Sequence, residues 1–380
     1  MIHIKNARLF VDGAFTDGSI VFDRKITALG AVEDAADVDA AGDYVIPGLV
    51  DIHTHAAMGA DASDGIPEGM PVLSRFYAAN GVTSWCPTTM TLKEPVLTEA
   101  MHTIRDFVRP ENGAKVAGVN LEGPFLCYAK RGAQAAENLH APDAELFKRL
   151  NEASGGIVRL VTVAPEEPGA IAFIKEVSRL ATVSIGHTVA DYDTAMAAYA
   201  AGASHATHLY NAMPPLHHRA PGVIGAASDS GATVELICDG IHSHPAVVRA
   251  TFRLFAGKVV LISDSMRCTG LPDGNYSLGG QPVTVLNGKC VLTGTDTIAG
   301  SSIHLLDGVR RAVSFGVPLE TAVTAATLTP AKVIGRADEI GSLAVGKCAD
   351  LVVLDKELNL KAVYIDGKRI SGGEREEAPQ

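Results

Sequence analysis

The stretch YVIPGLVDIHTHAAMG, residues 44–59, joins a buried strand to a pair of metal-type side chains. The run GLVDI is short, apolar and rich in branched residues, which is typical of a strand buried on both faces. His53 and His55 close this run. Side chains two residues apart on a strand point to the same face, so we expect both imidazole rings to project into one site.

A short apolar run followed by a helical pattern recurs about eight times between residues 48 and 342. This alternation predicts an α/β protein with a (β/α)8 barrel over residues 48–342. A doubly wound open sheet is the alternative, but no GxGxxG fingerprint supports it. The expected strands are LVDIH, TSWCPTT, VAGVNLEG, VRLVTVAPE, TVSIGHT, ASHATHL, VELICDG and VVLISDS, with helices near 70–80, 94–108, 143–153, 168–180 and 191–201.

The two ends of the chain carry a different pattern. Short alternating segments such as IHIKNARLF and KITALG lie near the start, between DG and GS turn signals, and ADLVVLD and LKAVYIDGKRI lie near the end. Such segments favour β-strands. We therefore expect residues 1–47 and 343–380 to pair into one small β domain beside the barrel.

The composition excludes several classes of protein. Apolar residues make up 47% of the chain and charged residues 20%, which is typical of a soluble globular protein. A formal net charge of −11 argues against nucleic-acid binding, and no apolar run is long enough to span a membrane. The six cysteines lack CxxC spacing and MIHIKNARLF shows no secretory signal, so we expect reduced thiols in the cytoplasm.

Metal-type side chains stand at the ends of the expected strands, where barrel enzymes place their chemistry. One histidine at a strand end is most often a hydrogen-bonded core residue, but a set at successive strand ends indicates a site. Imidazole and carboxylate ligands favour Zn, Fe, Mn and related divalent ions, and a bridging glutamate accommodates one ion or two. Beyond the histidines of the first strand, the set contains Glu122, His187, His208 and Asp264.

These motifs resemble the amidohydrolase superfamily and, within it, the N-acetylglucosamine-6-phosphate deacetylase family. The superfamily likeness rests on PGLVDIHTH and GSLAVGKCADLVVLD, and the closer one on NLEGPFL, IGHT, THLYNAMPPLHHRAPGVIGAA, CDGIHSHP, LISDS and TIAGS. The resemblance covers nearly the whole chain. It implies a TIM-type barrel with a small β-sandwich built from both termini, and an enzyme that releases acetate from N-acetyl-D-glucosamine 6-phosphate.

The resemblance also implies a role for each strand-end residue. Glu122, His187 and His208 hold the main ion, expected to be Zn with Fe, Mn or Co as alternatives. Water on that ion attacks the acetyl carbonyl, and Asp264 acts as general base and then as general acid. Many relatives have lost one or both histidines of the first-strand pair and bind one ion. This chain keeps both histidines, so one or two ions are expected.

The expected substrate contacts lie on loops that come after the strands. Arg219 can offer a fork of donors to a phosphate, and His242 can add a second contact. The resemblance implies that amides at Asn211 and Ala212 complete the phosphate site, and that the enzyme is a homodimer in which a phosphate contact crosses the interface. The other expected substrate-binding residues are Ala133, Gln134, Asp239, Gly240, Ile241, Ile298, Ala299 and Gly300.

Gln134 departs from the family pattern, because relatives usually carry a histidine there, and the resemblance implies that this residue orients the acetyl carbonyl. A glutamine amide can donate a hydrogen bond but cannot transfer a proton, so weakened catalysis is expected. Two alternatives to the main function stay open. One is a related amidohydrolase acting on N-acetylgalactosamine 6-phosphate or on a cyclic amide, and the other is a barrel of this family that has lost catalysis and only binds.

Overall fold

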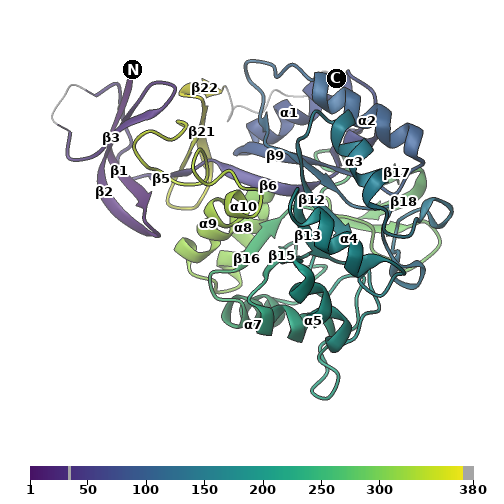
Figure 1. The fold of residues 1–380 in the computed structure, drawn as a ribbon. Coiled ribbons are helices and arrows are strands. Elements are labelled where there is room, and N and C mark those ends of the chain that lie inside the picture. The colour runs from purple at the N-terminus through teal and green to yellow at the C-terminus, as the bar shows by residue number, and fades with distance from the viewer. Residues whose placement is uncertain (33–35, 371–380) are drawn as a thin grey trace.

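The structure is a computed structural model that describes residues 1–32 and 36–370. The last part of the expected small domain, residues 371–380, lies outside the described residues. Figure 1 shows a barrel surrounded by helices, with a β-sheet at one side that contains the purple strands of the N-terminus. Among the described residues no helix is long and apolar enough to cross a membrane.

The barrel is a ring of parallel strands. Neighbouring strands pair in parallel from the first to the last. The ring closes where the Asp264 N–H donates to the His53 carbonyl at 2.9 Å. The predicted (β/α)8 barrel is confirmed, and the open doubly wound sheet is wrong. The barrel strands are β6 (Leu49–Thr54), β9 (Val82–Thr89), β11 (Val119–Leu121), β12 (Val158–Val163), β13 (Thr182–Ile185), β14 (His205–Ala206), β15 (Thr233–Ile237) and β16 (Val259–Ile262).

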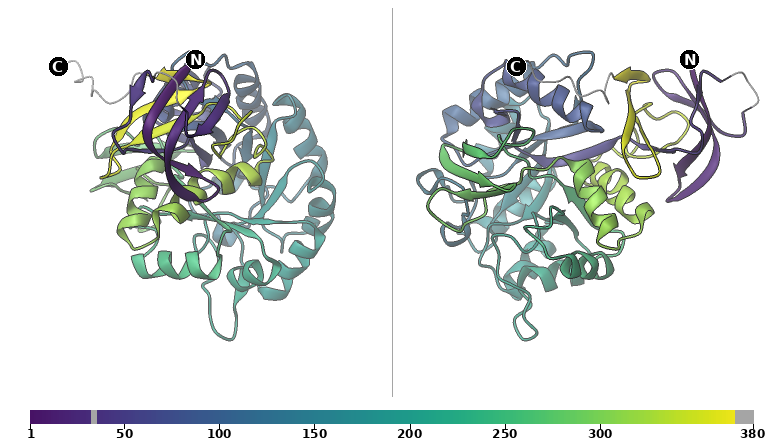
Figure 2. Two further views of the ribbon diagram at one scale, coloured as in Figure 1. Left: turned by 90° about the vertical axis from the view of Figure 1, so that its left-hand side faces the viewer. Right: turned by 180° about the vertical axis from the view of Figure 1, so that it is seen from behind.

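Helices cover the outside of the ring (Figure 2). Their apolar faces pack on the strands: in α2, for example, Leu97, Met101 and Ile104 recur at helical spacing and are buried. The five expected helix ranges agree with α1 to α5 to within three residues at either end. The helices are α1 (Gly69–Ala79), α2 (Glu94–Asp106), α3 (Ala144–Ala153), α4 (Ala170–Val177), α5 (Tyr192–Ala201), α6 (Gly222–Ser230), α7 (Pro245–Leu254), α8 (Leu305–Ser314), α9 (Leu319–Ala326) and α10 (Leu328–Val333).

A three-stranded antiparallel sheet, absent from the expected elements, interrupts the barrel between β16 and α8. It consists of β17 (Gly274–Leu278), β18 (Gln281–Leu286) and β19 (Lys289–Leu292). Asn287 and Gly288 join the last two strands with φ of 52° and 72°. Two positive φ values in a two-residue loop suit the twist of a hairpin, which is why Asn-Gly is a strong hairpin signal. This signal was available in the sequence.

A separate sheet outside the barrel combines both ends of the chain, as expected for a small β domain. Its strands are arranged in the order β22-β21-β20-β5-β1-β2-β3, with β4 beside β1. The N-terminal and C-terminal segments meet where β5 pairs antiparallel with β20, and Figure 2 shows the purple and yellow strands together. The strands are β1 (Ile2–Val11), β2 (Ala14–Phe22), β3 (Ile26–Gly30), β4 (Val38–Asp39), β5 (Tyr44–Pro47), β20 (Leu351–Leu354), β21 (Leu360–Ile365) and β22 (Lys368–Ile370).

A buried ion pair ties this sheet to the barrel. Lys115 lies on β10 (Lys115–Val116), which pairs with barrel strand β9. Its ammonium group lies 2.6 Å from Asp350, immediately before β20, and 3.1 Å from Asp366. Asp350 also accepts from the Asp366 N–H at 3.0 Å. Because Asp350 is only 4% exposed, this contact is shielded from water.

We expect Asp350→Ala to lower the free energy of unfolding by about 2 kcal/mol, because the Lys115 ammonium group keeps only its longer contact with Asp366 and the Asp366 N–H loses its acceptor. Urea unfolding measures the change. Asp17→Ala is the matched control: Asp17 pairs with Arg8, but its side chain is 93% exposed, so a change below about 0.5 kcal/mol is expected. Equal effects of the two substitutions would contradict this role of Asp350.

Candidate metal centre

The six strand-end residues meet at the C-terminal end of the barrel. They form two groups, His53 with His55 and Asp264, and Glu122 with His187 and His208, and within each group the ligand atoms lie within 4.8 Å of one another. Every one of these side chains is buried. The structure therefore brings together residues that are up to 211 positions apart in the sequence.

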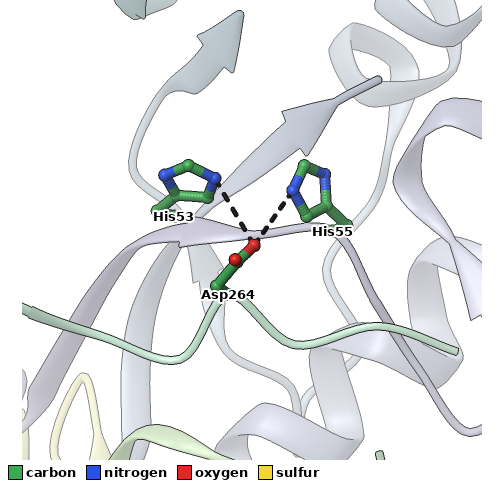
Figure 3. Close-up of side chains that lie close together, drawn as sticks. All are labelled: His53, His55 and Asp264. Carbon is green, nitrogen blue, oxygen red and sulfur yellow. Dashed lines mark ion pairs between the residues drawn. The ribbon is translucent and has the colours of Figure 1, made fainter. Parts of the chain in front are cut away.

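Figure 3 shows the first group. His53 lies on β6 and His55 immediately follows this strand, whereas Asp264 comes after the neighbouring strand β16. One oxygen of Asp264 lies 3.2 Å from Nε2 of His55 and 3.6 Å from Nε2 of His53. The two-residue spacing thus directs both rings toward one carboxylate.

Glu122 stands between the two groups. Its Oε1 lies 2.9 Å from Nε2 of His208, 3.2 Å from Nε2 of His187 and 3.4 Å from Nε2 of His53. Its Oε2 lies 3.3 Å from Nε2 of His55. One carboxylate therefore contacts all four imidazole rings, which is the arrangement a bridging ligand requires.

Three of the strand-end residues have unusual backbone geometry. His187, His208 and Asp264 have φ of 47°, 26° and 49°, in the left-handed region that non-glycine residues rarely adopt. Such strain persists where the surrounding structure enforces it, and it concentrates at functional sites. In this protein the three strained residues lie where the chain leaves β13, β14 and β16.

The outward ring nitrogens of three histidines are held by acceptors. In each case Nδ1 donates its proton outward, so Nε2 is the ring nitrogen that faces the centre and can bind a cation there. This pattern is typical of metal-ligating histidines, whose outer hydrogen bond selects the tautomer. The acceptors are Glu235 for His53 (2.9 Å), the Thr88 carbonyl for His55 (3.1 Å) and the Lys130 carbonyl for His187 (2.8 Å).

The inner atoms fit a divalent cation. Nε2 of His187 and Nε2 of His208 lie 3.1 Å apart and both face the same oxygen of Glu122. Nε2 of His53 is buried and has no hydrogen-bond partner among the described residues. Converging lone pairs of this kind need either extra protons or a cation, and imidazole with carboxylate is a ligand set for Zn and related ions.

The pKa values are consistent with a centre that attracts positive charge. Burial lowers the pKa of His55, but hydrogen bonds to Asp264 and Glu122 and the charges of both carboxylates outweigh burial and raise this pKa to about 9. Burial raises the pKa of Glu122, yet the charge of His53 and hydrogen bonds from the other histidines hold this pKa well below its usual range. Glu122 is therefore ionised, and protons occupy the place of a cation.

The metal centre opens into a cavity of about 640 Å³. Glu122, His187, His208 and Asp264 line its floor together with His55. Eight of the expected substrate-binding residues also line it: Ala133, Gln134, Asn211, Ala212, His242, Ile298, Ala299 and Gly300. Loops after several strands thus surround the centre, as in other barrels.

Four expected substrate-binding residues lie outside the lining of this cavity, as far as the described residues show: Arg219, Asp239, Gly240 and Ile241. Arg219 lies in the exposed segment 215–220, and its guanidinium group contacts His218 at 2.6 Å. Asp239 supports the lining instead. It accepts from the His242 N–H at 2.8 Å and lies 2.7 Å from Nδ1 of His242.

Gln134 is fixed by two hydrogen bonds. Its amide oxygen accepts from the Thr91 N–H at 2.7 Å, and its amide nitrogen donates to Oε2 of Glu122 at 2.8 Å. The glutamine that replaces the expected family histidine therefore contacts the bridging carboxylate.

Sequence reasoning missed several residues around the centre. Lys130 and Arg131 line the cavity and add positive charge to it. Glu235 contacts Nδ1 of His53. A charged residue inside the apolar run VELIC is a signal in the sequence that could have indicated a functional role for Glu235. His205 is buried and its Nε2 lies 3.2 Å from Glu235.

A barrel of parallel strands with imidazole and carboxylate groups at their C-terminal ends is typical of metal-dependent enzymes. The chain belongs to the amidohydrolase family, whose model matches residues 44–370. The resemblance found in the sequence is thereby confirmed.

Individual relatives are similar over most of their length. The chain is 40% identical over 325 residues to N-acetylglucosamine-6-phosphate deacetylase of Bacillus subtilis (strain 168), covering 83% of this chain and 82% of that protein. It is 34% identical over 378 residues to N-acetylgalactosamine-6-phosphate deacetylase of Escherichia coli O157:H7, covering 98% and 100%. A solved N-acetyl-D-glucosamine-6-phosphate deacetylase mutant from Mycobacterium smegmatis, in complex with N-acetyl-D-glucosamine-6-phosphate, has a TM-score of 0.92 at 33% identity, covering 97% and 99%.

We expect metal binding to release protons at pH 7.5. A ligating imidazole must be neutral, whereas a pKa of about 9 keeps His55 protonated in the metal-free protein. The apparent affinity for Zn²⁺ should therefore rise as the pH increases from 6.5 to about 9 and then level off. Calorimetric titration in two buffers of different ionisation enthalpy counts the protons. Binding without proton release would contradict the raised pKa.

Proposed function

We propose that this chain hydrolyses the acetamide of N-acetyl-D-glucosamine 6-phosphate to D-glucosamine 6-phosphate and acetate. One observation carries the proposal: the Glu122, His187 and His208 group opens, beside Asp264, into a cavity lined by eight of the residues expected to bind this substrate. The relatives with this name support the choice of substrate.

The chain's own residues account for the proton transfers. A divalent ion held by Glu122, His187 and His208 would supply an activated water and a Lewis acid for the acetyl carbonyl. Asp264 lines the same cavity and can accept a proton from the attacking water. Asp264 then returns this proton to the sugar nitrogen, so that the C–N bond breaks after the new C–O bond has formed.

We infer that Zn occupies the group around Glu122 and that a second ion binds to His53, His55 and Asp264. The ligand types suit Zn, and Fe, Mn or Co would use the same atoms. The short contacts of Glu122 with histidines from both groups support a bridge between two ions.

The test is acetate release by the zinc-loaded protein. We expect turnover of N-acetyl-D-glucosamine 6-phosphate, and loss of about 10³-fold in kcat for Asp264→Asn, which keeps the shape but removes the proton acceptor. Asparagine also tolerates the left-handed φ at this position. Zinc at the Glu122, His187 and His208 group and substrate binding should remain, because these three ligands are unchanged.

The same assay separates the alternatives. Preference for N-acetylgalactosamine 6-phosphate would overturn the proposed substrate and favour the activity named for the Escherichia coli relative. Binding of the sugar phosphate without any hydrolysis would favour a protein that has lost catalysis. Near-normal turnover by Asp264→Asn would refute the assigned role.

We further propose that the protein is a cytoplasmic homodimer in which Arg219 reaches the phosphate in the partner subunit's site. Two observations support this. Arg219 lies on the exposed segment 215–220, and it is not among the described residues that line the cavity of its own chain. His242 does line that cavity and would contact the phosphate from within the chain.

We expect Arg219→Ala to raise KM for the phosphorylated sugar by roughly tenfold or more, since hydrogen bonds to a charged group contribute about 1.5–3 kcal/mol. The unphosphorylated sugar should show no such change. Co-expression with Asp264→Asn provides the matched control, because a mixed dimer contains one site with both intact residues. Activity with low KM should return in the mixture, and no return would refute the contact across the interface.

A further inference from the structure

Glu235 is a fully buried carboxylate beneath the metal centre. It lies on β15, and its side chain is 0% exposed. Among the described residues, the ionisable groups that contact it are histidines: His53 Nδ1 at 2.9 Å and His205 Nε2 at 3.2 Å. A buried carboxylate is costly unless hydrogen bonds satisfy it, so these contacts stabilise its charged form.

Glu235 is itself held in place. Its Oε2 accepts from the backbone N–H of His208 at 3.0 Å, and Oε1 faces His205, whose Nδ1 lies 2.6 Å from the Thr233 hydroxyl. The carboxylate is therefore fixed by His205 on β14 and by His208 just after that strand, before any contact with His53 is counted. A fixed acceptor can orient a ring that donates to it.

The contact with His53 decides which ring nitrogen faces the metal centre. Nδ1 of His53 donates to Oε2 of Glu235, so Nε2 is the ring nitrogen left to bind a cation. This Nε2 lies 3.4 Å from Glu122 and 3.6 Å from Asp264 and has no hydrogen-bond partner in the described part of the chain. Without Glu235, the ring could rotate or take the other tautomer, and its inner lone pair would be lost.

We propose that Glu235 is a positioning residue that holds His53 as a metal ligand, an inference that deepens the metal centre of the proposed function. Glu235 does not line the cavity, within the residues described, so it acts through His53 and not on the substrate. A carboxylate behind a histidine also increases the basicity of the ring, which strengthens the bond to a cation.

The experiment titrates metal-free protein with Zn²⁺ against a chelator and measures no hydrolysis. Glu235→Leu should weaken Zn²⁺ binding through His53 by about 10–100-fold, the usual effect of losing such an outer partner. Glu235→Gln should lose less, because its amide oxygen can still accept from Nδ1 of His53. If Glu235→Leu does not fold, Glu235→Asp carries the same test, since its shorter side chain withdraws the acceptor.

Two controls separate positioning from general destabilisation. Asp350→Ala removes another buried carboxylate far from the centre in sequence and fold, and it should leave Zn²⁺ binding unchanged while lowering stability. In a His53→Ala background, Glu235→Leu should cause no further loss of Zn²⁺ affinity. The proposal would be overturned if Glu235→Leu bound Zn²⁺ as tightly as the original chain. It would also be overturned if Glu235→Leu lowered Zn²⁺ affinity as much in the His53→Ala background as it does in the original chain. Neither result depends on which substrate is hydrolysed, so a failed acetate assay leaves this test intact.

Discussion

The structure depends on one constraint, a buried carboxylate surrounded by four imidazole rings. Glu122 is 2% exposed and lies within 3.4 Å of His53, His55, His187 and His208. Charged groups that are removed from water must be compensated by partners of opposite charge. In this centre the compensating charge comes from protons or from a cation, and the converging Nε2 atoms favour the cation.

The scaffold around the centre makes this arrangement rigid. Parallel strands bring their C-terminal ends to one rim, and the Asp264 N–H bonds the His53 carbonyl where the ring closes. Behind the ligands, Glu235 and the carbonyls of Thr88 and Lys130 hold ring nitrogens outward. Strained φ values at His187, His208 and Asp264 persist because strand pairing and these hydrogen bonds surround them.

Features with a regular period in the sequence could be predicted, whereas features that depend on tertiary contacts could not. Alternating strands and helices, the strand-end ligands and the two-residue spacing of His53 and His55 have local signals. The hydrogen bond of Gln134 to Glu122 has none, because it requires a loop to fold over the centre. Cys268 and Cys290 likewise show no paired spacing, yet their sulfur atoms lie 3.5 Å apart as free thiols. The outward position of Arg219 also depends on how its loop packs.

The most direct measurement is anomalous X-ray diffraction from crystals of the zinc-loaded protein, with data collected on both sides of the zinc absorption edge. We predict an anomalous peak within about 2.0–2.3 Å of Glu122, His187 and His208, the ordinary distance for Zn ligands. Zinc bound elsewhere, with these three side chains free of metal, would contradict a catalytic centre built around Glu122.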